Sequence, residues 1–396
     1  MSTLIEQGKN SFMTNYKQFD IVIDHGEGNY VYDIDGKKYL DFVAGIATNS
    51  LGYGNQALKD ALHAQVDKFL HCSNLYWNEP SIHAATKMVA LSGLDKVFFC
   101  NSGAESIEAS MKLARKAQKA NGNDEKTEYI SMMDSFHGRT FAAITATGQL
   151  KYQKGLNPLF PGVSYGKFND IESIKALVTD KTCAIMVEPV QGEGGIKPAE
   201  QSFMTELRTL CDEKEIILIF DEVQCGIGRT GQFFAYQNYG IKPDIVCLAK
   251  GLGSGVPIGA IIANEKTAKG FQPGDHAATF GSNPLVTSAA SVVLDVIGDD
   301  EFLADVTDKG MYLSEKLHAL EIKHDFLTGV RGLGLMQGLV FDLKIDRLGI
   351  VMQAMEKGLL LVTAGSDVIR FVPPLTIKKE EIDECMTILE DILSEL

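Results

Sequence analysis

Short apolar segments alternate with amphipathic stretches through the middle of the chain, from about residue 55 to residue 290. Apolar runs of this length, bounded by polar or glycine residues, are typical of strands that are buried on both faces. Six strands are predicted on this basis, at residues 96–100, 128–132, 183–187, 216–220, 244–248 and 258–263. Because helical stretches separate them, the pattern indicates an α/β fold with a mainly parallel central sheet.

The two ends of the chain show other patterns. Near the N-terminus, alternating segments at 30–33 and 38–42 flank Asp35 and Gly36, and an Asp-Gly pair in this position is a strong hairpin signal. Past residue 300 the predicted elements are a helix at 302–320, strands at 335–341 and 368–372, and a last helix with one apolar face formed by Ile382, Met386, Leu389, Leu393 and Leu396.

The length and charge of the chain limit its organisation and partners. A chain of 396 residues favours two domains, and we expect a large domain at 51–295 and a smaller α+β domain formed jointly by 1–50 and 296–396. The net charge of −15 argues against nucleic acid and anionic membranes as partners. We expect neither a membrane span nor a signal peptide, because no apolar run is long enough and the N-terminal segment is polar.

The cysteines favour a reducing compartment. Their number, seven, is odd, and none are spaced as CxxC, so no structural zinc site or other metal centre is expected. Cys100, Cys183 and Cys247 lie in apolar runs and are predicted to be core residues. This usage favours a cytoplasmic location.

Two predicted strands end in charged side chains. The run 216–220 is followed by Asp221 and Glu222, and the run 244–249 is followed by Lys250. Ligands bind just outside the carboxyl ends of parallel strands. A lysine that can form an imine, with a carboxylate that keeps a pyridinium nitrogen protonated, is the equipment for pyridoxal phosphate (PLP). A single acid or lysine at a strand end is more often a turn former or solvated, but the pair is harder to explain in that way.

The segment after the first predicted strand has the features of an anion site. Ser102 and Glu105 have the spacing of a capping box at the start of a helix predicted at 104–120. Free backbone amides at a helix start, beside a glycine such as Gly103, can bind a phosphate group. The alternative is an ordinary helix cap, which is common.

Two further loops follow predicted strands. The loop 135–140 contains Phe136, which can stack on a planar ring, and Arg139, whose guanidinium can bind a carboxylate. The loop 188–195 is rich in glycine and contains two acids, Glu188 and Glu193. Taken singly, Phe136 and Arg139 are more often explained by packing and solvation, and the two acids are explained equally well by a charged turn.

The segment Gly226–Gly231 matches the GxGxxG pattern of dinucleotide-binding proteins. In such proteins the glycines stand directly at a strand-to-helix turn, with an acid about 20 residues further on. Here residues 221–225 intervene, and no acid stands at that distance. We therefore do not expect an NAD site.

These segments together resemble the class III (ornithine-type) PLP-dependent aminotransferases of fold type I, over nearly the whole chain. The segments that carry the resemblance are Asn101-Ser102-Gly103-Ala104-Glu105, Phe136-His137-Gly138-Arg139-Thr140, Glu188-Pro189-Val190-Gln191-Gly192-Glu193, Asp221-Glu222-Val223-Gln224, Leu248-Ala249-Lys250-Gly251 and Thr279-Phe280-Gly281. The segments at 41–47 and 370–374 are most like the bacterial acetylornithine aminotransferase branch. The resemblance implies a large domain around a mainly parallel sheet and a smaller domain built from both chain ends.

The resemblance implies the following cofactor contacts. Lys250 would form the imine with PLP and transfer the proton, and Asp221 would bind the pyridinium nitrogen. Gln224 would reach the ring hydroxyl, while Phe136 and Val223 would lie on either side of the ring. The phosphate would be held by Ser102, Gly103 and Ala104.

The resemblance also implies substrate contacts and a second subunit. Thr279 would reach the phosphate from the other subunit of a homodimer with shared active sites. Arg370 would bind the α-carboxylate of 2-oxoglutarate or glutamate, and Glu193 would pair with Arg370 while the other substrate is bound. Arg139 would take the carboxylate of an acylated amino acid, and Tyr16 is expected to line the same pocket.

Two positions depart from the family pattern. Ala278 stands where a hydroxyl residue is usual, and Ser282 where a second glycine is usual. We expect Ala278 to lie among the substrate-binding residues, and both changes to affect substrate contacts or the contact between subunits. Ile46 occupies a position where ornithine aminotransferases have a tyrosine, and isoleucine suits an acylated amine better.

The implied reaction converts N2-acetylornithine and 2-oxoglutarate to N-acetylglutamate 5-semialdehyde and glutamate, a step of arginine biosynthesis. The same features leave other reactions open. These are transamination of ornithine, succinylornithine, 4-aminobutyrate or a lysine-pathway relative, and an aminomutase reaction of the same fold. A protein that binds PLP without catalysis is the alternative outside enzymes.

Overall fold

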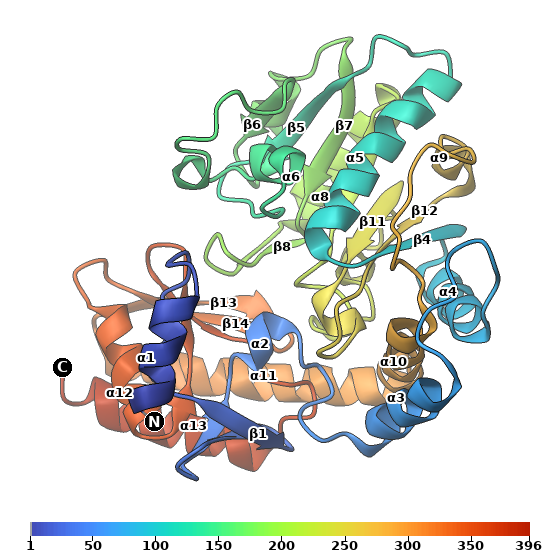
Figure 1. The fold of residues 1–396 in the computed structure, drawn as a ribbon. Helices are drawn as coiled ribbons and strands as arrows, with labels where there is room; N and C mark the ends of the chain where they lie inside the picture. Colours follow the sequence, from blue (N-terminus) through green and yellow to red (C-terminus); the bar gives the residue numbers. More distant parts are fainter. Residues whose placement is uncertain (1) are drawn as a thin grey trace.

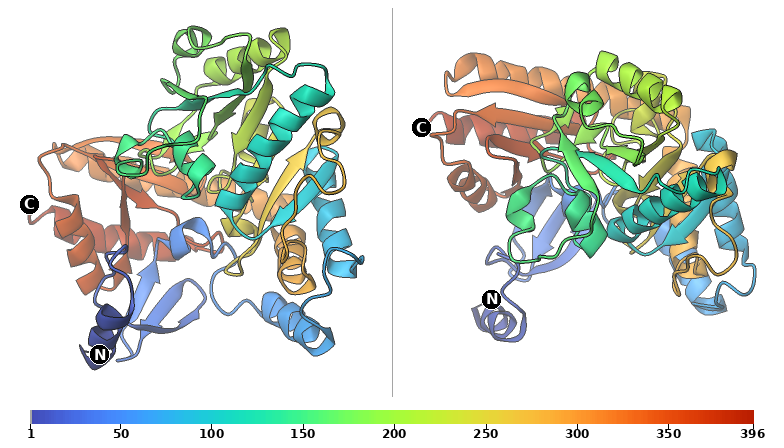
Figure 2. Two further views of the ribbon diagram at one scale, coloured as in Figure 1. Left: turned by 45° about the horizontal axis from the view of Figure 1, so that its top comes forward. Right: turned by 90° about the horizontal axis from the view of Figure 1, so that it is seen from above.

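The computed structural model describes residues 2–396 and contains a seven-stranded sheet, two four-stranded sheets and a two-stranded ribbon (Figure 1). The seven-stranded sheet lies in the upper part of the view, and both chain ends lie together below it. Helix α1 (Ser2–Ser11) projects from the edge of the molecule (Figure 2). Within residues 2–396, no helix has both the length and the apolar character needed to cross a bilayer.

The seven-stranded sheet has the order β4-β12-β11-β10-β7-β5-β6. Its strands are β4 (Lys96–Cys100), β5 (Glu128–Met132), β6 (Val163–Gly166), β7 (Thr182–Val187), β10 (Ile217–Asp221), β11 (Ile245–Leu248) and β12 (Gly259–Ala263). The five strands from β11 to β6 are parallel, whereas β12 pairs antiparallel with both of its neighbours. The predicted mainly parallel sheet is confirmed.

Both faces of this sheet are covered, which explains the continuous apolar runs of its strands. In β10, Ile217 and Ile219 pack in the cluster that contains α5 (Gly103–Ala120), and Leu218 and Phe220 pack in the cluster that contains α8 (Gln201–Glu213). Successive side chains of a strand point to opposite faces, so one apolar run fills two cores.

The two chain ends contribute to the same sheets. One four-stranded sheet has the order β1-β2-β3-β15, so three N-terminal strands pair with one C-terminal strand. The other has the order β13-β14-β17-β16. The bounds are β1 (Ile23–Glu27), β2 (Tyr30–Asp33), β3 (Lys38–Asp41), β13 (Leu327–Leu333), β14 (Met336–Phe341), β15 (Leu359–Leu360), β16 (Val362–Ala364) and β17 (Val368–Phe371), with the ribbon formed by β8 (Val190–Gln191) and β9 (Lys197–Pro198).

The remaining helices complete the layers around these sheets. Helices α4 and α10 pack together beside β4, and α11 packs against β13 and β14. The remaining α-helices are α2 (Ala44–Ala47), α3 (Gln56–Lys68), α4 (Glu79–Ser92), α6 (Phe141–Ala146), α7 (Ile171–Lys175), α9 (Glu265–Ala268), α10 (Pro284–Ile297), α11 (Asp300–Lys323), α12 (Arg347–Glu356) and α13 (Lys379–Leu393), and the 3₁₀ helices are η1 (Leu150–Tyr152), η2 (Ala235–Tyr239) and η3 (Lys250–Leu252).

The element predictions are confirmed with few exceptions. All six predicted strands are present within one residue of their predicted ends, as are the hairpin of β2 and β3 and the predicted core cysteines Cys100, Cys183 and Cys247. The strands that were not predicted include β6 of the seven-stranded sheet and β13, β15 and β16 in the C-terminal part of the chain. One residue of the last apolar face was wrong, because Leu396 lies beyond the end of α13 and is exposed.

Candidate active site

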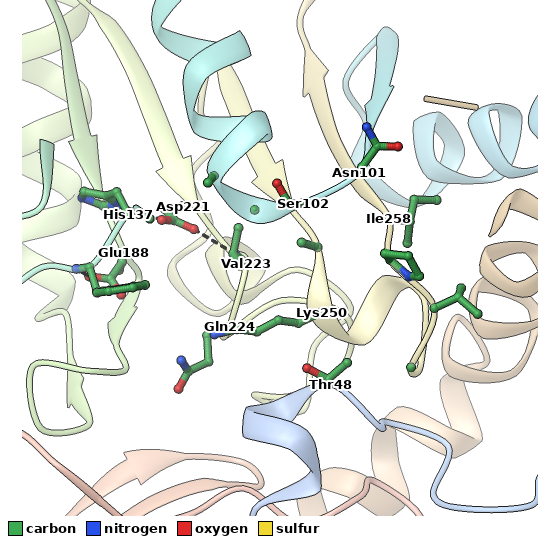
Figure 3. A pocket seen from close by; sticks show the side chains of 18 residues that line it. Thr48, Asn101, Ser102, His137, Glu188, Asp221, Val223, Gln224, Lys250 and Ile258 are labelled. Carbon is green, nitrogen blue, oxygen red and sulfur yellow. Dashed lines mark hydrogen bonds and ion pairs between the residues drawn. The ribbon is translucent and has the colours of Figure 1, made fainter. Parts of the chain in front are cut away.

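A cavity of about 370 Å³ lies at the carboxyl ends of the parallel strands, where the sequence places its strand-end charges (Figure 3). Both strand-end residues, Lys250 and Asp221, line it. Its other walls come from the start of α5, the loops after β5 and β7, and α2. The lining residues used in the argument below are Thr48, Ser102, Gly103, Ala104, Phe136, His137, Glu188, Val223 and Gln224. One cavity therefore contains nearly all the predicted cofactor residues.

Lys250 enters this cavity from a sharp turn after β11. Its backbone φ is +42°, a left-handed conformation that is uncommon outside glycine, and such strain often marks functional sites. Burial holds the pKa of Lys250 below its ordinary value, although the carboxylate of Glu193 acts in the opposite direction. A lowered pKa favours the neutral amine, which is the form that attacks an aldehyde.

Asp221 is held in place by two hydrogen bonds. Its Oδ2 lies 2.7 Å from Nδ1 of His137, and its Oδ1 accepts the amide of Val223 at 2.9 Å. Because a carboxylate accepts, the imidazole carries a proton on Nδ1. The His137 side chain is fully buried, and within residues 2–396 its Nε2 has no partner. His137 therefore orients Asp221 at the position predicted to face a pyridinium nitrogen.

The start of α5 forms a cradle of backbone amides. Ser102 is the N-cap residue, and its Oγ accepts the amide of Glu105 at 3.2 Å. The Glu105 carboxylate accepts the amide of Asn101 at 2.6 Å, one residue before the position expected for a capping box. In the described part of the chain, the amides of Gly103 and Ala104 have no acceptor. They can therefore bind an anion.

Gly103 shows that this cradle fits a phosphate group. A Cβ at Gly103 would lie 2.8 Å from Cγ1 of Val223, so any other residue would crowd the side chain that lines the cavity beside it. The amides, the helix dipole and the open backbone together provide what a phosphate requires. The residues present therefore fit PLP, because the amides at the start of α5, Asp221 and Lys250 all line one cavity (Figure 3).

The buried Arg370 and the half-buried Glu193 form an ion pair beside this cavity. Arg370 lies on β17, is 1% exposed, and donates from Nη1 to Oε1 of Glu193 at 2.5 Å and to Oε1 of Gln224 at 2.9 Å. Burial would raise the pKa of Glu193, but the Arg370 charge and hydrogen bond outweigh it and hold the pKa below its ordinary value. Arg370 Nε has no partner within residues 2–396, so the guanidinium retains a free donor.

Glu193 and Arg370 lie beside the cavity without lining it, and four further predicted site residues lie outside it in this chain. Thr279 and Arg139 are exposed, Ala278 is half-buried, and none of the three lines the cavity. Arg139 instead lies over the ring of Tyr152, with its Cζ 3.9 Å from the ring centre. Tyr16 is 74% exposed and lines a separate hollow beside α1. One chain alone therefore brings together the cofactor residues and the Arg370 pair, but not these four.

Sequence reasoning gave no role to several residues of the cavity wall, among them His137, Glu188 and Thr48. His137 stands in the predicted loop but was given no role, although its place between Phe136 and Arg139 was a signal. Glu188 was recorded only as one of two loop acids. Thr48 directly follows α2, in which Ala44 to Ala47 all have positive φ values of 50° to 63°. No sequence signal except Gly45 could have indicated this left-handed turn.

Comparison with known proteins identifies the class to which this fold and site belong. The model of the family "Aminotransferase class-III" matches residues 11–393, so the chain belongs to the class III aminotransferases. The ornithine aminotransferase of Toxoplasma gondii ME49 has the same fold, with a TM-score of 0.95 and 30% identity, covering 100% of this chain and 95% of that one. The fold is accordingly the predicted fold type I, the activity is that of an aminotransferase, and PLP is the cofactor.

Two curated relatives narrow the class further. The chain is 49% identical over 393 residues to a protein named acetylornithine aminotransferase from Caldanaerobacter subterraneus subsp. tengcongensis, covering 99% of this chain and 100% of the relative. It is 45% identical over 371 residues to a protein named succinylornithine transaminase from Photorhabdus laumondii subsp. laumondii, covering 93% and 92%. Both names refer to acylated ornithines as substrates.

Proposed function

We propose that this chain transfers the δ-amino group of N2-acetylornithine to 2-oxoglutarate, giving N-acetylglutamate 5-semialdehyde and glutamate in arginine biosynthesis. The relatives named acetylornithine aminotransferase support the substrate. The observation that carries the proposal is the buried Arg370, paired with Glu193 at 2.5 Å beside the cavity of Lys250. In this pair, Arg370 can bind the carboxylate of one substrate, and Glu193 can neutralise Arg370 while the other substrate is bound. Two dissimilar substrates in one pocket require such an arrangement.

The cofactor residues take the predicted roles in this proposal. PLP, when bound, supplies an aldehyde for Lys250 and a ring that withdraws electrons from the substrate carbon. Asp221, oriented by His137, keeps the ring nitrogen protonated, and Phe136 and Val223 flank the ring. Ser102, Gly103 and Ala104 hold the phosphate. Lys250 removes the proton from the substrate δ-carbon, because that carbon bears the amine to be transferred.

Arg370 and Glu193 let one pocket serve both substrates. With 2-oxoglutarate, Arg370 releases Glu193 and binds the α-carboxylate, for which its planar fork of donors is suited. With N-acetylornithine, no carboxylate lies next to the reacting carbon, so Glu193 stays paired and neutralises Arg370. Gln224, already bound to Arg370 through Oε1, also lines the cofactor cavity and is assigned to the ring hydroxyl.

A second copy of the chain completes the site in this proposal. Thr279 reaches the phosphate from the partner, and Ala278, Arg139 and Tyr16 line the substrate pocket. Exposed apolar side chains near this loop support a covered face, among them Trp77, which is 89% exposed. The segment 74–77 contacts the loop of Ala278 and Thr279, because Nδ2 of Asn74 donates to the carbonyl of Ala278 at 2.9 Å.

The domain division and the cytoplasmic location belong to the same proposal. The pairing of β3 with β15 supports a small domain formed by 1–50 and 296–396 beside a large domain at 51–295. The seven cysteines are free thiols, six of them buried, which supports a reducing compartment.

The experiment that tests the proposal measures the two half-reactions separately by absorbance. Purified protein loaded with PLP should lose its visible cofactor band when N-acetylornithine is added, and regain it with 2-oxoglutarate. A band that responds faster to succinylornithine, ornithine or 4-aminobutyrate would keep the mechanism and replace the substrate. Turnover without added 2-oxoglutarate would indicate an aminomutase instead, and failure to bind PLP would refute the proposal.

A further inference from the structure

Glu188 is a third carboxyl group of the site, and the function proposed above does not use it. It directly follows β7, lines the cavity and is 5% exposed. The other two acids have basic partners, since Asp221 bonds to His137 and Glu193 bonds to Arg370. Hydrogen bonds to Glu188 from residues 2–396 come only from backbone amides. Burying a carboxylate without a cationic partner costs free energy, and this cost favours the neutral acid.

The two amides that bind Glu188 belong to the two loops beside the cofactor. Its Oε2 accepts the amide of Phe136 at 3.1 Å, and its Oε1 accepts the amide of Gly192 at 3.4 Å. Phe136 begins the turn that also places His137 against Asp221, and Gly192 precedes Glu193. One side chain therefore connects the turn that flanks the ring to the loop that pairs with Arg370.

The surroundings of Glu188 favour its protonated form. Burial raises its pKa well above the ordinary value, and the nearby Asp221 carboxylate raises it further. Its two amide bonds and the charge of Lys250 act in the opposite direction and do not outweigh these effects. Two carboxyl groups close together in a buried site do not both ionise readily. Asp221 has the imidazole of His137 as a partner, whereas Glu188 has backbone amides alone.

We propose that Glu188 is a positioning residue that the holoenzyme keeps as a carboxylic acid, joining the Phe136 turn to the Gly192 loop while leaving Asp221 as the single carboxylate against the cofactor ring. The proposal rests on the cofactor site described above and on no particular substrate. The positioning role requires the length and the oxygen atoms of the Glu188 side chain, and it does not require a negative charge on that side chain. Glu188→Gln keeps the length and one acceptor oxygen, whereas Glu188→Ala removes both.

The test uses the resting holoenzyme without substrate. The visible cofactor band is titrated with pH in the wild type and in Glu188→Gln. Because the imine of Lys250 gains its proton more readily beside an anion, removal of a carboxylate would lower the midpoint by about one unit or more. If Glu188 is already neutral, the midpoint of Glu188→Gln should lie within about 0.3 pH units of the wild-type midpoint. A clear fall of the midpoint in Glu188→Gln would overturn the carboxylic-acid assignment.

The connecting role is measured by the rate at which PLP dissociates from each protein. Glu188→Ala, which loses both amide hydrogen bonds, should release PLP at least about tenfold faster than the wild type, and Glu188→Gln, which keeps one acceptor oxygen, should have a rate between the two. Equal rates in all three proteins would overturn this role. If Glu188→Ala does not fold, Glu188→Asp serves instead, because it is too short to reach both loops.

A matched control is Glu222→Gln. Glu222 is a buried acid next to Asp221, but its oxygens accept the amides of Ala235 and Tyr236, away from the cavity. It should change neither the titration midpoint nor the PLP dissociation rate. If Glu222→Gln released PLP as fast as Glu188→Ala does, loss of any buried acid in this region would have the same effect, and the assignment to Glu188 would be overturned. Absence of a cofactor band in the wild type would instead refute the cofactor site itself.

Discussion

The buried part of the site and its exposed part are built in different ways. Asp221 at the end of β10 and Arg370 on β17 are buried, and the half-buried Lys250 follows β11. All three are surrounded by residues of the same chain. Thr279 and Tyr16 lie on the surface, at positions that the core does not constrain. The cofactor chemistry is therefore encoded by a single chain, while substrate capture and the last phosphate contact depend in our proposal on a second surface.

This difference predicts which changes have large effects. Substitutions of the cofactor residues in the buried part should affect both half-reactions, because the same residues serve every step. A substitution of Arg370, which is also buried, should affect mainly the half-reaction whose substrate presents an α-carboxylate next to the reacting carbon. Substitutions in the exposed part should affect one substrate, or the cofactor affinity, while the absorbance of the bound cofactor stays normal.

The largest effect is expected for Lys250→Ala. Turnover should fall by roughly 10³-fold or more, because the group that binds the cofactor and moves the proton is lost. The visible band of the cofactor should disappear with it, as measured by absorbance and steady-state rates. Lys344→Ala, which changes an exposed lysine, is the control and should behave as the wild type. Turnover that survives in Lys250→Ala would contradict the assignment.

The next effect is expected for Arg370→Ala. The KM for 2-oxoglutarate should rise by about 100-fold, since a charge-assisted hydrogen bond is worth about 1.5–3 kcal/mol. The half-reaction with the amine donor should change much less. Arg370→Lys keeps the charge without the planar fork and should be intermediate. An equal loss in both half-reactions would show that Arg370 supports the fold rather than one substrate.

A smaller and one-sided effect is expected for Arg139→Ala in the exposed part. The KM for N-acetylornithine should rise by about tenfold, because one carboxylate contact is lost. The KM for 2-oxoglutarate and the cofactor band should stay unchanged. Steady-state kinetics with each substrate varied in turn measure this, with Arg139→Lys as the variant that keeps the charge. A change in the cofactor band would place Arg139 in the buried part instead.

The smallest effect concerns stability and pH. Burial raises the pKa of Glu222 from 4.5 to about 8. Between these values the folded protein keeps a proton that the unfolded chain has lost, so the unfolding free energy falls as the pH rises through this interval. In Glu222→Gln the side chain does not ionise, but it can accept only one of the two hydrogen bonds from the amides of Ala235 and Tyr236. It should be less stable than the wild type by about 1–3 kcal/mol at pH 5, and by less at pH 9.

Thermal unfolding of both proteins at pH 5 and pH 9 checks the sign of this effect. A stability difference that is the same at both pH values would show that Glu222 has the same charge in the folded and unfolded states. A difference that grows at pH 9 would contradict the raised pKa.

The same contrast explains how much the sequence could predict. The ends of β10 and β11 were predictable because buried parallel strands have continuous apolar runs, and the residue after the run is fixed within one position. Strand β6 was missed because it is short, lies at the sheet edge and has alternating burial without an apolar run. Leu396 was misplaced because helical spacing continues in the sequence past the point where α13 ends.

The contacts of the site were less predictable than its members. The spacing of residues gives no sign that His137 points at Asp221, since 84 residues separate them and the fold alone brings them together. Glu188 was visible as a charged loop residue, but its binding to the Phe136 amide depends on how two loops meet. The position of Tyr16 was beyond prediction for another reason, because a surface segment has no core to fix it.

The measurement that tests the central claim most directly is complementation between two defective chains, one without the imine-forming lysine and one with weakened cofactor binding. Lys250→Ala and Thr279→Ala variants are prepared separately, then unfolded together and refolded with limiting PLP. If Thr279 acts across a dimer, half of the randomly paired dimers contain one fully intact site out of two, so about a quarter of wild-type turnover should return. Activity no higher than the mean of the two separate variants would contradict a site completed by the second chain.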